Sequence, residues 1–414
     1  MKKYTLLDPI HGQIEFDTKD PEQALLFALI NTPEFQRLRR IRQLGFSAFT
    51  FMGAEGSRFI HSIGAMQIMR QMLKALSDYA PEEVKHYQLA LMVAALLHDL
   101  GHGAFSHSSE PAFGFEHEHW TQKLIRSDSK IHTLLRDYDS KLPLLVNEIL
   151  AGSAQPSWLC TLVSSQLDCD RADYLTRDSV QTGTKYGLFQ LDRIIQNLAL
   201  TEDLHGQKQV VIREKGLAAV EYFLFARYAM YRQVYHHKKT LSSDALYTSL
   251  FKRARDLMLQ GQLLDSNSTL RAWLRKEEDL SFEDFLEMDD ALIWQYLKAW
   301  AKSSADPILG DLADRLLNRR LFGVVPIERL GEAGFQRLHS LIPEPELPYY
   351  CLVKECHQFP YNDRKKPILV ELMDGEIREL SKVSGISATL TNKSADLDQV
   401  YCFAPKEYLA QIQE

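Results

Sequence analysis

The sequence predicts a mainly α-helical protein that carries a smaller α+β lobe at its C-terminal end. Apolar residues recur at helical spacing through most of residues 1–320, and the run 89–97 has the length and the alanine and leucine content of a buried helix. In the tail, short β-branched and aromatic runs separated by turn residues replace that pattern. We therefore expect a helical body over 1–320 and an α+β lobe over 321–414.

Individual elements follow from local periodicity and from the residues that bound it. Proline, glycine or a capping residue bounds most of the predicted helices, which cover 21–30, 34–45, 61–73, 89–97 and 216–258, with others between 120 and the 160s and along 250–340. Residues 6–16 should be extended. The run 209–212 should be a strand, and with the turn at 202–206 before it we expect a small hairpin. Tail strands are expected over 349–353, 367–372 and 400–403, with Asp374-Gly375 as a hairpin turn.

Composition limits the class of protein. The hydrophobic fraction of 45% is ordinary for a globular chain, and the net charge of -7 argues against extensive nucleic-acid binding. No apolar run reaches the ~18 residues that span a bilayer, so no membrane partner is expected. The 5 cysteines contain no CxxC pair, which suits a reducing, cytoplasmic compartment. Cys351, Cys356 and His357 are poorly spaced for zinc, and we favour ordinary strand or loop roles for them.

The stretch 96–107 holds the residues with the clearest chemistry. His98 and Asp99 directly follow the predicted buried helix, and burying such groups is costly unless something pairs with them. A divalent metal is the simplest explanation, and a mixed imidazole and carboxylate set allows Mn²⁺, Mg²⁺, Fe²⁺, Ni²⁺ or Zn²⁺. His61 lies near the start of another predicted helix, Asp170 opens or lies within a third, and both can complete the site. Any one of these residues alone would suggest a cap or a surface group, but their combination favours a metal site.

A metal site with these neighbours suits phosphoester hydrolysis. A bound divalent ion lowers the pKa of a coordinated water and neutralises charge on a phosphoryl oxygen. His102, His107 and His117 titrate in the range useful for proton transfer to a leaving oxygen. The dense arginines of 37–42 can bind phosphate, although the apolar spacing around them also allows a solvated helix face.

Seven short motifs extend this interpretation. They run in order from residue 8 to 178: DPIHG at 8–12, TPEFQRLR at 32–39, QLG at 43–45, RFIHS at 58–62, HDLGHGAFSH at 98–107, DCDRADY at 168–174 and RD at 177–178. With them, the chain resembles the HD-domain deoxynucleoside triphosphate triphosphohydrolases (dNTPases), the branch of the animal SAM-and-HD-domain enzyme and its bacterial dGTPase-like relatives. The match continues to about 240 and is loose in the tail, and no part of this sequence resembles a SAM domain. The resemblance implies an HD-domain helical bundle, with the motif region at about 55–180.

The resemblance also implies a role for each matching residue. The implied metal ligands are His61, His98, Asp99 and Asp170. The implied catalytic residues, near the leaving 5′ oxygen and the α-phosphate, are His107, His117, His102 and Glu110. Phosphates would be bound by Arg58, Arg171, Tyr174, Arg227, His237 and Lys238, and the sugar by Gln43, Leu44, Asp178 and Tyr235. Activating nucleotides would contact Asn31, Gln36 and Arg39 in one site, and Arg213 and Lys215 in the neighbouring site.

Two of these positions depart from the family pattern. Glu110 stands where relatives carry an aspartate, which keeps the charge but lengthens the side chain. Asn31 stands where the animal enzyme uses an aspartate to recognise guanine, which puts guanine-nucleotide activation in question. Activator sites in the family lie between subunits, so the resemblance implies a homo-oligomer, a tetramer or a dimer.

The leading hypothesis is hydrolysis of a dNTP at the α-phosphorus to deoxynucleoside and triphosphate. One alternative is an HD phosphohydrolase that acts on another phosphorylated metabolite, such as a nucleoside monophosphate or a cyclic or alarmone nucleotide. The other is a nucleotide-sensing or nucleic-acid-binding protein, which only the basic clusters 37–42 and 236–239 support. The complete set of candidate ligands and histidines favours hydrolysis.

Overall fold

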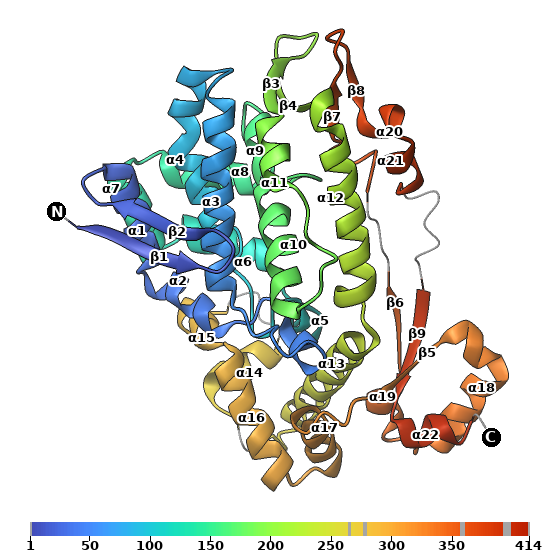
Figure 1. Cartoon of the computed structure of the whole chain (residues 1–414). Coiled ribbons are helices and arrows are strands. Elements are labelled where there is room, and N and C mark those ends of the chain that lie inside the picture. The colour runs from blue at the N-terminus through green and yellow to red at the C-terminus, as the bar shows by residue number, and fades with distance from the viewer. Residues whose placement is uncertain (1, 264–265, 276–279, 357–360, 392–398, 413–414) are drawn as a thin grey trace.

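Helices form most of the protein in the computed structural model, which describes residues 2–263, 266–275, 280–356, 361–391 and 399–412. Small β-sheets lie at the edges of the helical body (Figure 1). This arrangement confirms the predicted fold class. Within the described residues, no helix combines the length and the apolar character needed to cross a membrane.

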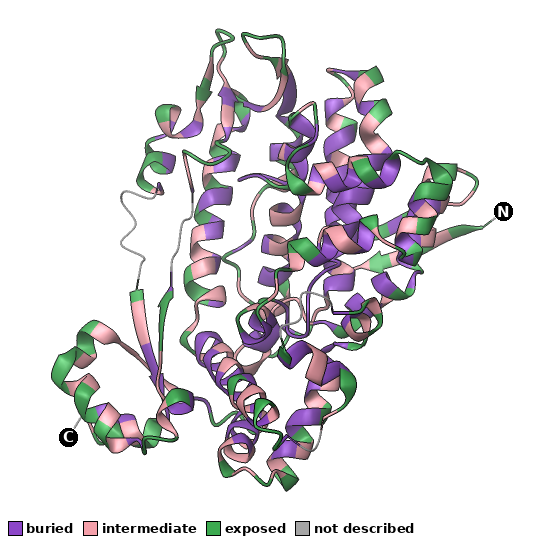
Figure 2. Cartoon of the chain, turned by 180° about the vertical axis from the view of Figure 1, so that it is seen from behind, coloured by how far each residue is buried: buried purple, intermediate pink, exposed green. Residues whose placement is uncertain are grey.

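Three long helices at the centre of the body carry the site. They are α3 (Arg58–Leu76), α4 (Pro81–Leu97) and α10 (Cys169–Thr182), and α3 packs against both others. Every residue from Leu89 to Leu97 is buried, as the apolar run predicts. Buried residues likewise line the inner faces of the neighbouring helices (Figure 2). The ends of the three helices meet, so polar residues at those ends share one region of the core.

The N-terminal segment differs from the sequence-based expectation in two places. Residues 6–16 form a hairpin of β1 (Lys3–Asp8) and β2 (Gly12–Asp17). The helix expected over 34–45 is wrong beyond its first turns. After α1 (Pro21–Ile30), helix α2 (Pro33–Arg37) is followed by the 3₁₀ turns η1 (Leu38–Arg40) and η2 (Gly45–Phe49).

Contacts remote in sequence explain this early end of the helix. The backbone N–H of Gln43 donates to the carbonyl of Gly56 at 2.8 Å, and that of Arg58 donates to Ile41 at 2.9 Å. The side chain of Arg37 is buried and donates to the carbonyls of Met288 at 2.6 Å and His102 at 2.8 Å. The segment therefore pairs with the chain before α3 and does not continue as a helix.

The long helical pattern over 216–258 forms two helices. These are α12 (Leu217–Met230) and α13 (Lys238–Leu259), separated by the π turn η5 (Tyr231–Tyr235). His237 is extended, and its Nδ1 accepts from the backbone N–H of Lys239 at 3.2 Å, so it caps α13. The break turns Tyr231, Tyr235 and His236 toward the inside of the body.

The remaining helices complete the body and the tail. Between α4 and α12 lie η3 (Ser106–Ser108), α5 (Ser109–Phe113), α6 (His117–Arg126), α7 (Lys130–Tyr138), α8 (Leu142–Ala151), α9 (Trp158–Val163), α11 (Leu191–Gln196) and η4 (Glu214–Gly216). After α13 come α14 (Ser268–Arg275), α15 (Phe282–Glu287), α16 (Asp290–Ser303), α17 (Pro307–Leu317), α18 (Ile327–Leu341), α19 (Leu347–Tyr350), α20 (Leu380–Val383), α21 (Gly385–Thr389) and α22 (Lys406–Ala410). Gly101 lets α6 approach, since a Cβ there would lie 2.0 Å from the carbonyl oxygen of His117.

The tail contributes strands to two different sheets. β3 (Leu198–Glu202), β4 (Lys208–Arg213), β7 (Leu369–Glu371) and β8 (Ile377–Glu379) form one sheet, in which β4 and β7 are parallel. β5 (Gly323–Pro326), β9 (Gln399–Ala404) and β6 (Leu352–Cys356) form the other. The hairpins at 209–212 and around Asp374-Gly375 are confirmed. The strand expected over 349–353 is shifted: α19 occupies its first residues, and β6 begins at Leu352. His357 lies outside the described residues.

Arg37 provides a test of the buried contacts that join α2 to the segment before α16. Arg37→Ala should lower the free energy of unfolding by about 3 kcal/mol, because two buried carbonyls lose their donor and a cavity opens. Arg40→Ala is the matched control: the Arg40 side chain is 52% exposed and pairs with Asp289, a surface ion pair worth under about 1 kcal/mol. Chemical denaturation followed by circular dichroism measures both, and equal losses would contradict this account.

Candidate metal centre and substrate pocket

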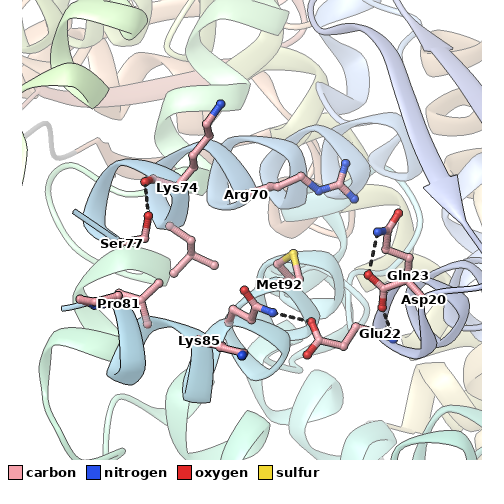
Figure 3. A pocket seen from close by; sticks show the side chains of 12 residues that line it. Asp20, Glu22, Gln23, Arg70, Lys74, Ser77, Pro81, Lys85 and Met92 are labelled. Atoms are coloured by element: carbon pink, nitrogen blue, oxygen red, sulfur yellow. Dashed lines mark hydrogen bonds between the residues drawn. The ribbon is translucent and has the colours of Figure 1, made fainter. Parts of the chain in front are cut away.

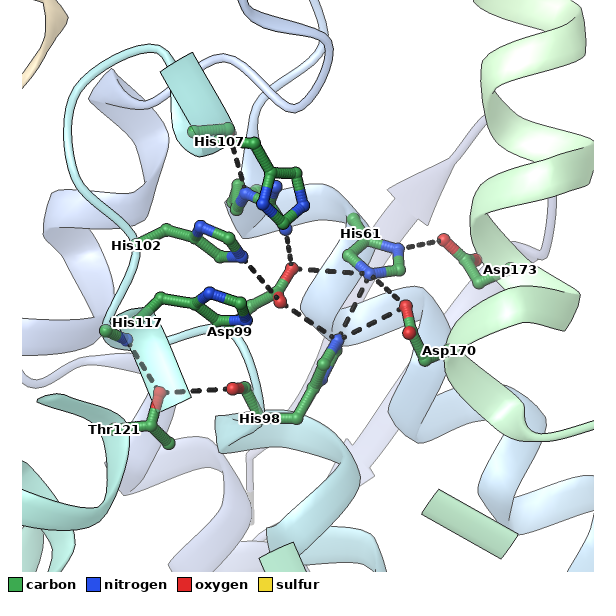
Figure 4. A network of polar contacts seen from close by, with 12 residues as sticks. His61, His98, Asp99, His102, His107, His117, Thr121, Asp170 and Asp173 are labelled. Atoms are coloured by element: carbon green, nitrogen blue, oxygen red, sulfur yellow. Dashed lines mark hydrogen bonds and ion pairs between the residues drawn. The ribbon is translucent and has the colours of Figure 1, made fainter. Parts of the chain in front are cut away.

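Four polar side chains from three helix ends converge (Figure 4). They are His61 in the first turn of α3, His98 and Asp99 after α4, and Asp170 in the first turn of α10. His61 Nε2 lies 3.1 Å from Asp170 Oδ1 and 3.2 Å from His98 Nε2. His98 Nε2 lies 3.3 Å from Asp99 Oδ1. Such spacings match neighbouring ligand atoms around one ion with bonds of about 2.1 Å, so the quartet can hold a divalent metal.

The opposite nitrogen of each of these imidazoles is also bonded. Nδ1 of His61 lies 2.8 Å from Asp173 Oδ2, and Nδ1 of His98 lies 2.8 Å from the carbonyl oxygen of Ala95. Both partners accept, so each ring carries its proton on Nδ1 and turns Nε2 toward the other ligands. Outer contacts of this kind orient metal-binding histidines.

Asp173 is the centre of a buried network that sequence reasoning did not assign. Its carboxylate contacts His11 Nε2 at 2.6 Å and Arg177 Nε at 2.7 Å, and Arg177 also pairs with Asp8 at 2.7 Å. Asp173 and Arg177 are fully buried. The signal was present, since all four residues lie in quoted motifs. The N-terminal hairpin thus supports the orientation of His61.

The electrostatics of the quartet favour a cation. Burial alone would lower the pKa of His61, but its hydrogen bonds with Asp170 and Asp173 raise that pKa to about 10. Burial would raise the pKa of Asp99, yet the adjacent guanidinium of Arg58 and its histidine neighbours hold it well below the usual range. The carboxylates therefore attract positive charge, which protons or a divalent ion can supply. The donor set fits such an ion.

A second cluster contains the predicted catalytic residues. Glu110 Oε1 lies 2.7 Å from His117 Nδ1 and 3.2 Å from His107 Nδ1, while the His102 ring stacks on that of His117 at 3.9 Å and 13°. One ion cannot lie in the planes of two nearly parallel rings, so the arrangement suits proton transfer better than a second metal. Burial would raise the pKa of Glu110, but its hydrogen bonds to the histidines hold it well below the usual range. For His102, burial disfavours the charged imidazolium and so keeps the pKa well below its usual range.

A cavity of about 520 Å³ lies against both clusters. Most of the residues predicted to bind substrate line it, namely Gln43, Leu44, Arg58, Arg171, Tyr174, Asp178 and Tyr235. Arg227 lies behind the wall and donates to Gln166 Oε1 at 3.0 Å. His236 lines the cavity where His237 was expected, and Lys238 borders another cavity beside Arg329. The substrate roles of all ten residues stay predictions, and Arg227, His237 and Lys238 do not line this cavity.

Several polar atoms around this cavity are buried without a hydrogen-bond partner among the described residues. They include Gln43 Oε1, Arg171 Nε, Asp178 Oδ1 and Arg227 Nε. Buried polar atoms are normally satisfied, and a polar ligand would satisfy these. The hydroxyl of Tyr235 donates to Asp178 Oδ2 at 3.0 Å, and burial raises the pKa of Asp178 to about 7.

Sequence reasoning assigned no role to several further residues that line the cavity, among them Tyr231, His236, Asp244 and Lys354. Tyr231 and His236 belong to the aromatic and basic stretch after α12, where the helix break decides which side chains face inward. Asp244 accepts from the Ser108 hydroxyl at 2.6 Å. Lys354 comes from β6 in the tail, and no local pattern marked it.

The predicted activator residues form two separate groups. Gln36 Oε1 accepts from Arg39 Nε at 2.8 Å, and the Arg39 guanidinium lies 3.5 Å over the ring of Phe59 at the start of α3. Asn31 ends α1 close by in sequence. Arg213 lies over Tyr79, just beyond the other end of α3, and Lys215 follows β4. A helix of 19 residues is about 28 Å long, so one chain does not bring the two groups together.

A second cavity, of about 640 Å³, lies between α1, α3 and α4 (Figure 3). Its acidic groups are bonded to neighbours: Asp20 accepts from Gln23 at 2.9 Å and Glu22 from Gln88 at 2.8 Å. Its cationic residues, Arg70, Lys74 and Lys85, come from α3 and α4, whereas its acidic residues lie at the start of α1. It lacks the convergent ligands of the first cavity, which is therefore the candidate site.

Comparison with known proteins agrees with this geometry. Residues 58–177 match the HD domain, and residues 189–339 match the HD associated region. The uncharacterized protein YwfO of Bacillus subtilis is 36% identical over 95% of this chain and 90% of its own length. Deoxynucleoside triphosphate triphosphohydrolase SAMHD1 of Bos taurus is 30% identical over 80% of this chain and 61% of its own length.

Among solved structures, a phosphohydrolase from Bacteroides thetaiotaomicron superimposes with a TM-score of 0.82 at 30% identity, covering 97% of this chain and 100% of that one. The candidate ligands His61, His98, Asp99 and Asp170 all fall inside the segment that matches the HD domain. The chain therefore belongs to the HD-domain phosphohydrolase family.

Proposed function

We propose that the protein hydrolyses deoxynucleoside triphosphates at the α-phosphorus, releasing deoxynucleoside and triphosphate. The observation that carries the proposal is one cavity that joins the candidate metal ligands, the histidine cluster and the Gln43, Leu44 and Tyr235 group. The similarity of the chain to SAMHD1, a deoxynucleoside triphosphate triphosphohydrolase by name, supports this choice of substrate. The chain spans about three fifths of that relative's length.

In the proposed reaction, water attacks the α-phosphorus and the bond to the 5′ oxygen breaks. His61, His98, Asp99 and Asp170 would hold a divalent ion, which would supply an activated water and positive charge beside the phosphate. The leaving 5′ oxygen takes a proton from an imidazole, either His107 or His117. Glu110 accepts from Nδ1 of both rings, so it orients them with Nε2 free to donate. Arg58 and Arg171 provide positive charge for the phosphate chain.

The part of the cavity lined by Gln43, Leu44 and Tyr235 is proposed to hold the sugar. Tyr235 is fixed by its hydrogen bond to Asp178, and Gln43 and Leu44 line the same cavity. A tyrosine ring packed against C2′ would exclude the extra hydroxyl of ribose by steric conflict, which is the simplest way to reject a ribonucleotide.

We further propose that nucleotide activation, where it occurs, requires a second copy of the chain. The two groups of activator residues lie at opposite ends of α3 within one chain, so neighbouring activator sites built from both groups would form across subunits. This supports a homo-oligomer, a dimer or a tetramer. We propose a cytoplasmic location on cysteine usage alone.

The alternatives differ in their support. Hydrolysis of another phosphorylated metabolite uses the same metal and histidines, and only the sugar-side residues favour a dNTP over it. A nucleic-acid-binding role relied on the arginines of 37–42. Arg37 is buried, Arg40 pairs with Asp289 and Arg42 pairs with Glu55 at 2.5 Å. These three guanidinium groups are therefore less available to bind the phosphates of a nucleic acid.

Product analysis tests the proposed reaction. The purified protein with Mn²⁺ should convert a dNTP, supplied singly or as a four-way mixture, to deoxynucleoside and intact triphosphate resolved by ion-exchange chromatography. Asp99→Ala should lower kcat by roughly 10³-fold or more, because it removes a metal ligand. Lys123→Ala, outside the cavity, is the control. Monophosphate or diphosphate products would assign the protein to a different phosphohydrolase reaction.

Sugar selection is tested at Tyr235. Tyr235→Ala should raise the ratio of kcat/KM for NTP to that for dNTP by about tenfold, because the steric block at C2′ is removed. Tyr235→Phe keeps the ring and loses only the bond to Asp178, so its ratio should stay close to wild type. Steady-state kinetics with matched nucleotide pairs measures both. A ratio unchanged in Tyr235→Ala would exclude the steric role.

Metal binding should be coupled to pH. His61 carries a raised pKa of about 10, so at pH 7 the metal-free ring holds a second proton, on Nε2, that the ion must displace. Affinity for Mn²⁺ should therefore rise with pH, by about tenfold per unit for each proton released. Calorimetry in buffers of different ionisation enthalpy counts the protons. An affinity independent of pH would contradict the assignment.

The contact between Asp173 and His61 gives a second test. Asp173→Asn should weaken Mn²⁺ binding about 10- to 100-fold.

A further inference from the structure

We propose that Asp290, the first residue of α16, is a positioning residue that holds the turn carrying His107 against the segment carrying Gln43. The inference rests on the proposed phosphoester hydrolysis at this site and adds a residue to it. Asp290 lies within the HD-associated region, distant in sequence from both segments that it contacts. It does not line the cavity and so does not touch substrate.

The turn before His107 has an unfavourable backbone conformation. Phe105 and Ser106 both have φ of 57°, in the left-handed region that non-glycine residues rarely adopt. Two such residues in succession persist only where the surroundings hold them. His107 follows directly, so relaxation of this turn would move its imidazole away from Glu110 and the cavity.

Asp290 is placed to hold this turn. Its Oδ1 accepts from the backbone N–H of Phe105 at 2.7 Å, and its Oδ2 accepts from the backbone N–H of Arg42 at 3.1 Å. The side chain is almost fully buried. Both partners are donors, so both oxygens must accept. A carboxylate does this, whereas an amide side chain presents a donor at one of the two positions.

The contacts form a closed ring around the two segments. The Ser106 hydroxyl donates to the carbonyl of Arg42 at 2.6 Å and accepts from Arg58 Nε at 2.8 Å. Arg42 is therefore held at its N–H by Asp290 and at its carbonyl by Ser106. Arg42 directly precedes Gln43, so the ring links the proton-donor side of the cavity to the sugar side.

Packing reinforces the same junction. Trp294, one turn after Asp290 on α16, meets the Phe105 ring edge-on at 5.5 Å, and Phe46 stacks on the other side of that ring at 4.3 Å. Gly45 sits against the turn, where a Cβ would lie 2.8 Å from the Phe105 carbonyl oxygen. The two segments are thus in direct contact, and Asp290 fixes their relative position.

A purely local role for Asp290 in starting α16 is already filled by its neighbour. Asp289 caps the helix, because its Oδ1 accepts from the backbone N–H groups of Ala291 at 3.0 Å and Leu292 at 3.1 Å. Asn is as good a cap as Asp. Asp289→Asn is therefore a matched control: it changes a carboxylate on the same turn that makes no contact with Phe105 or Arg42.

Hydrogen exchange of the metal-loaded full chain tests the positioning directly. In Asp290→Asn, backbone amides in peptides covering 103–110 and 41–46 should exchange faster by roughly tenfold or more than in wild type. Asp289→Asn should match wild type, and thermal unfolding with metal analysis establishes that both variants are folded and loaded. Burial raises the pKa of Asp290 to about 7, so the measurement is made near pH 8.5, where both oxygens accept. Unchanged exchange in Asp290→Asn would overturn the proposal.

Two substrates that differ in their leaving group distinguish misplacement of the His107 imidazole from a general loss of activity in Asp290→Asn. Asp290→Asn should lower kcat for a dNTP by about 10- to 100-fold, because a misplaced imidazole protonates the leaving 5′ oxygen poorly. Turnover of p-nitrophenyl phosphate should change less than about threefold, because p-nitrophenolate leaves without a proton. Equal losses with both substrates would overturn the positioning role. Wild-type turnover of p-nitrophenyl phosphate without any dNTP hydrolysis would reject the proposed function, and hydrogen exchange would still decide the role of Asp290.

Discussion

The buried carboxylate of Asp173 is the constraint on which the rest of the site depends. It lies without exposed surface among His11, His61 and Arg177. A carboxylate in such a place is tolerated only with a full set of partners, and removing one partner leaves the remaining charges poorly compensated. The network therefore joins the N-terminal hairpin, α3 and α10 in one arrangement, and that arrangement sets the direction of the His61 ring.

Local periodicity was a good guide to the body and a poor guide to its interruptions. The buried run 89–97 was predicted because nine apolar residues leave little alternative. The early end of the helix after Arg37 was not predicted, because the apolar spacing continues through 44 while the backbone N–H of Arg42 is bonded to Asp290 far along the chain. The break at 231–237 has a similar origin, since His237 caps a new helix inside an unbroken apolar pattern.

The candidate site was predictable where motifs carry it and unpredictable where tertiary structure does. His61, His98, Asp99 and Asp170 converge as expected, and their assignment as ligands stays a prediction. His236 lines the cavity in place of His237, because a π turn shifts the facing of successive residues. Lys354 reaches the cavity from a strand whose sequence has no distinctive pattern, so only the pairing of β6 with β9 brings it near.

The parallel pairing of β4 with β7 has a consequence for how the chain is made. Ile212 pairs with Val370, so the edge of β4 stays open during synthesis until residues 369–371 have emerged. Open strand edges template association with other chains, and parallel pairing between distant segments forms slowly. A ribosome-bound nascent chain that already contains the HD motifs thus carries an uncovered edge, and premature termination before 369 would leave it permanently exposed.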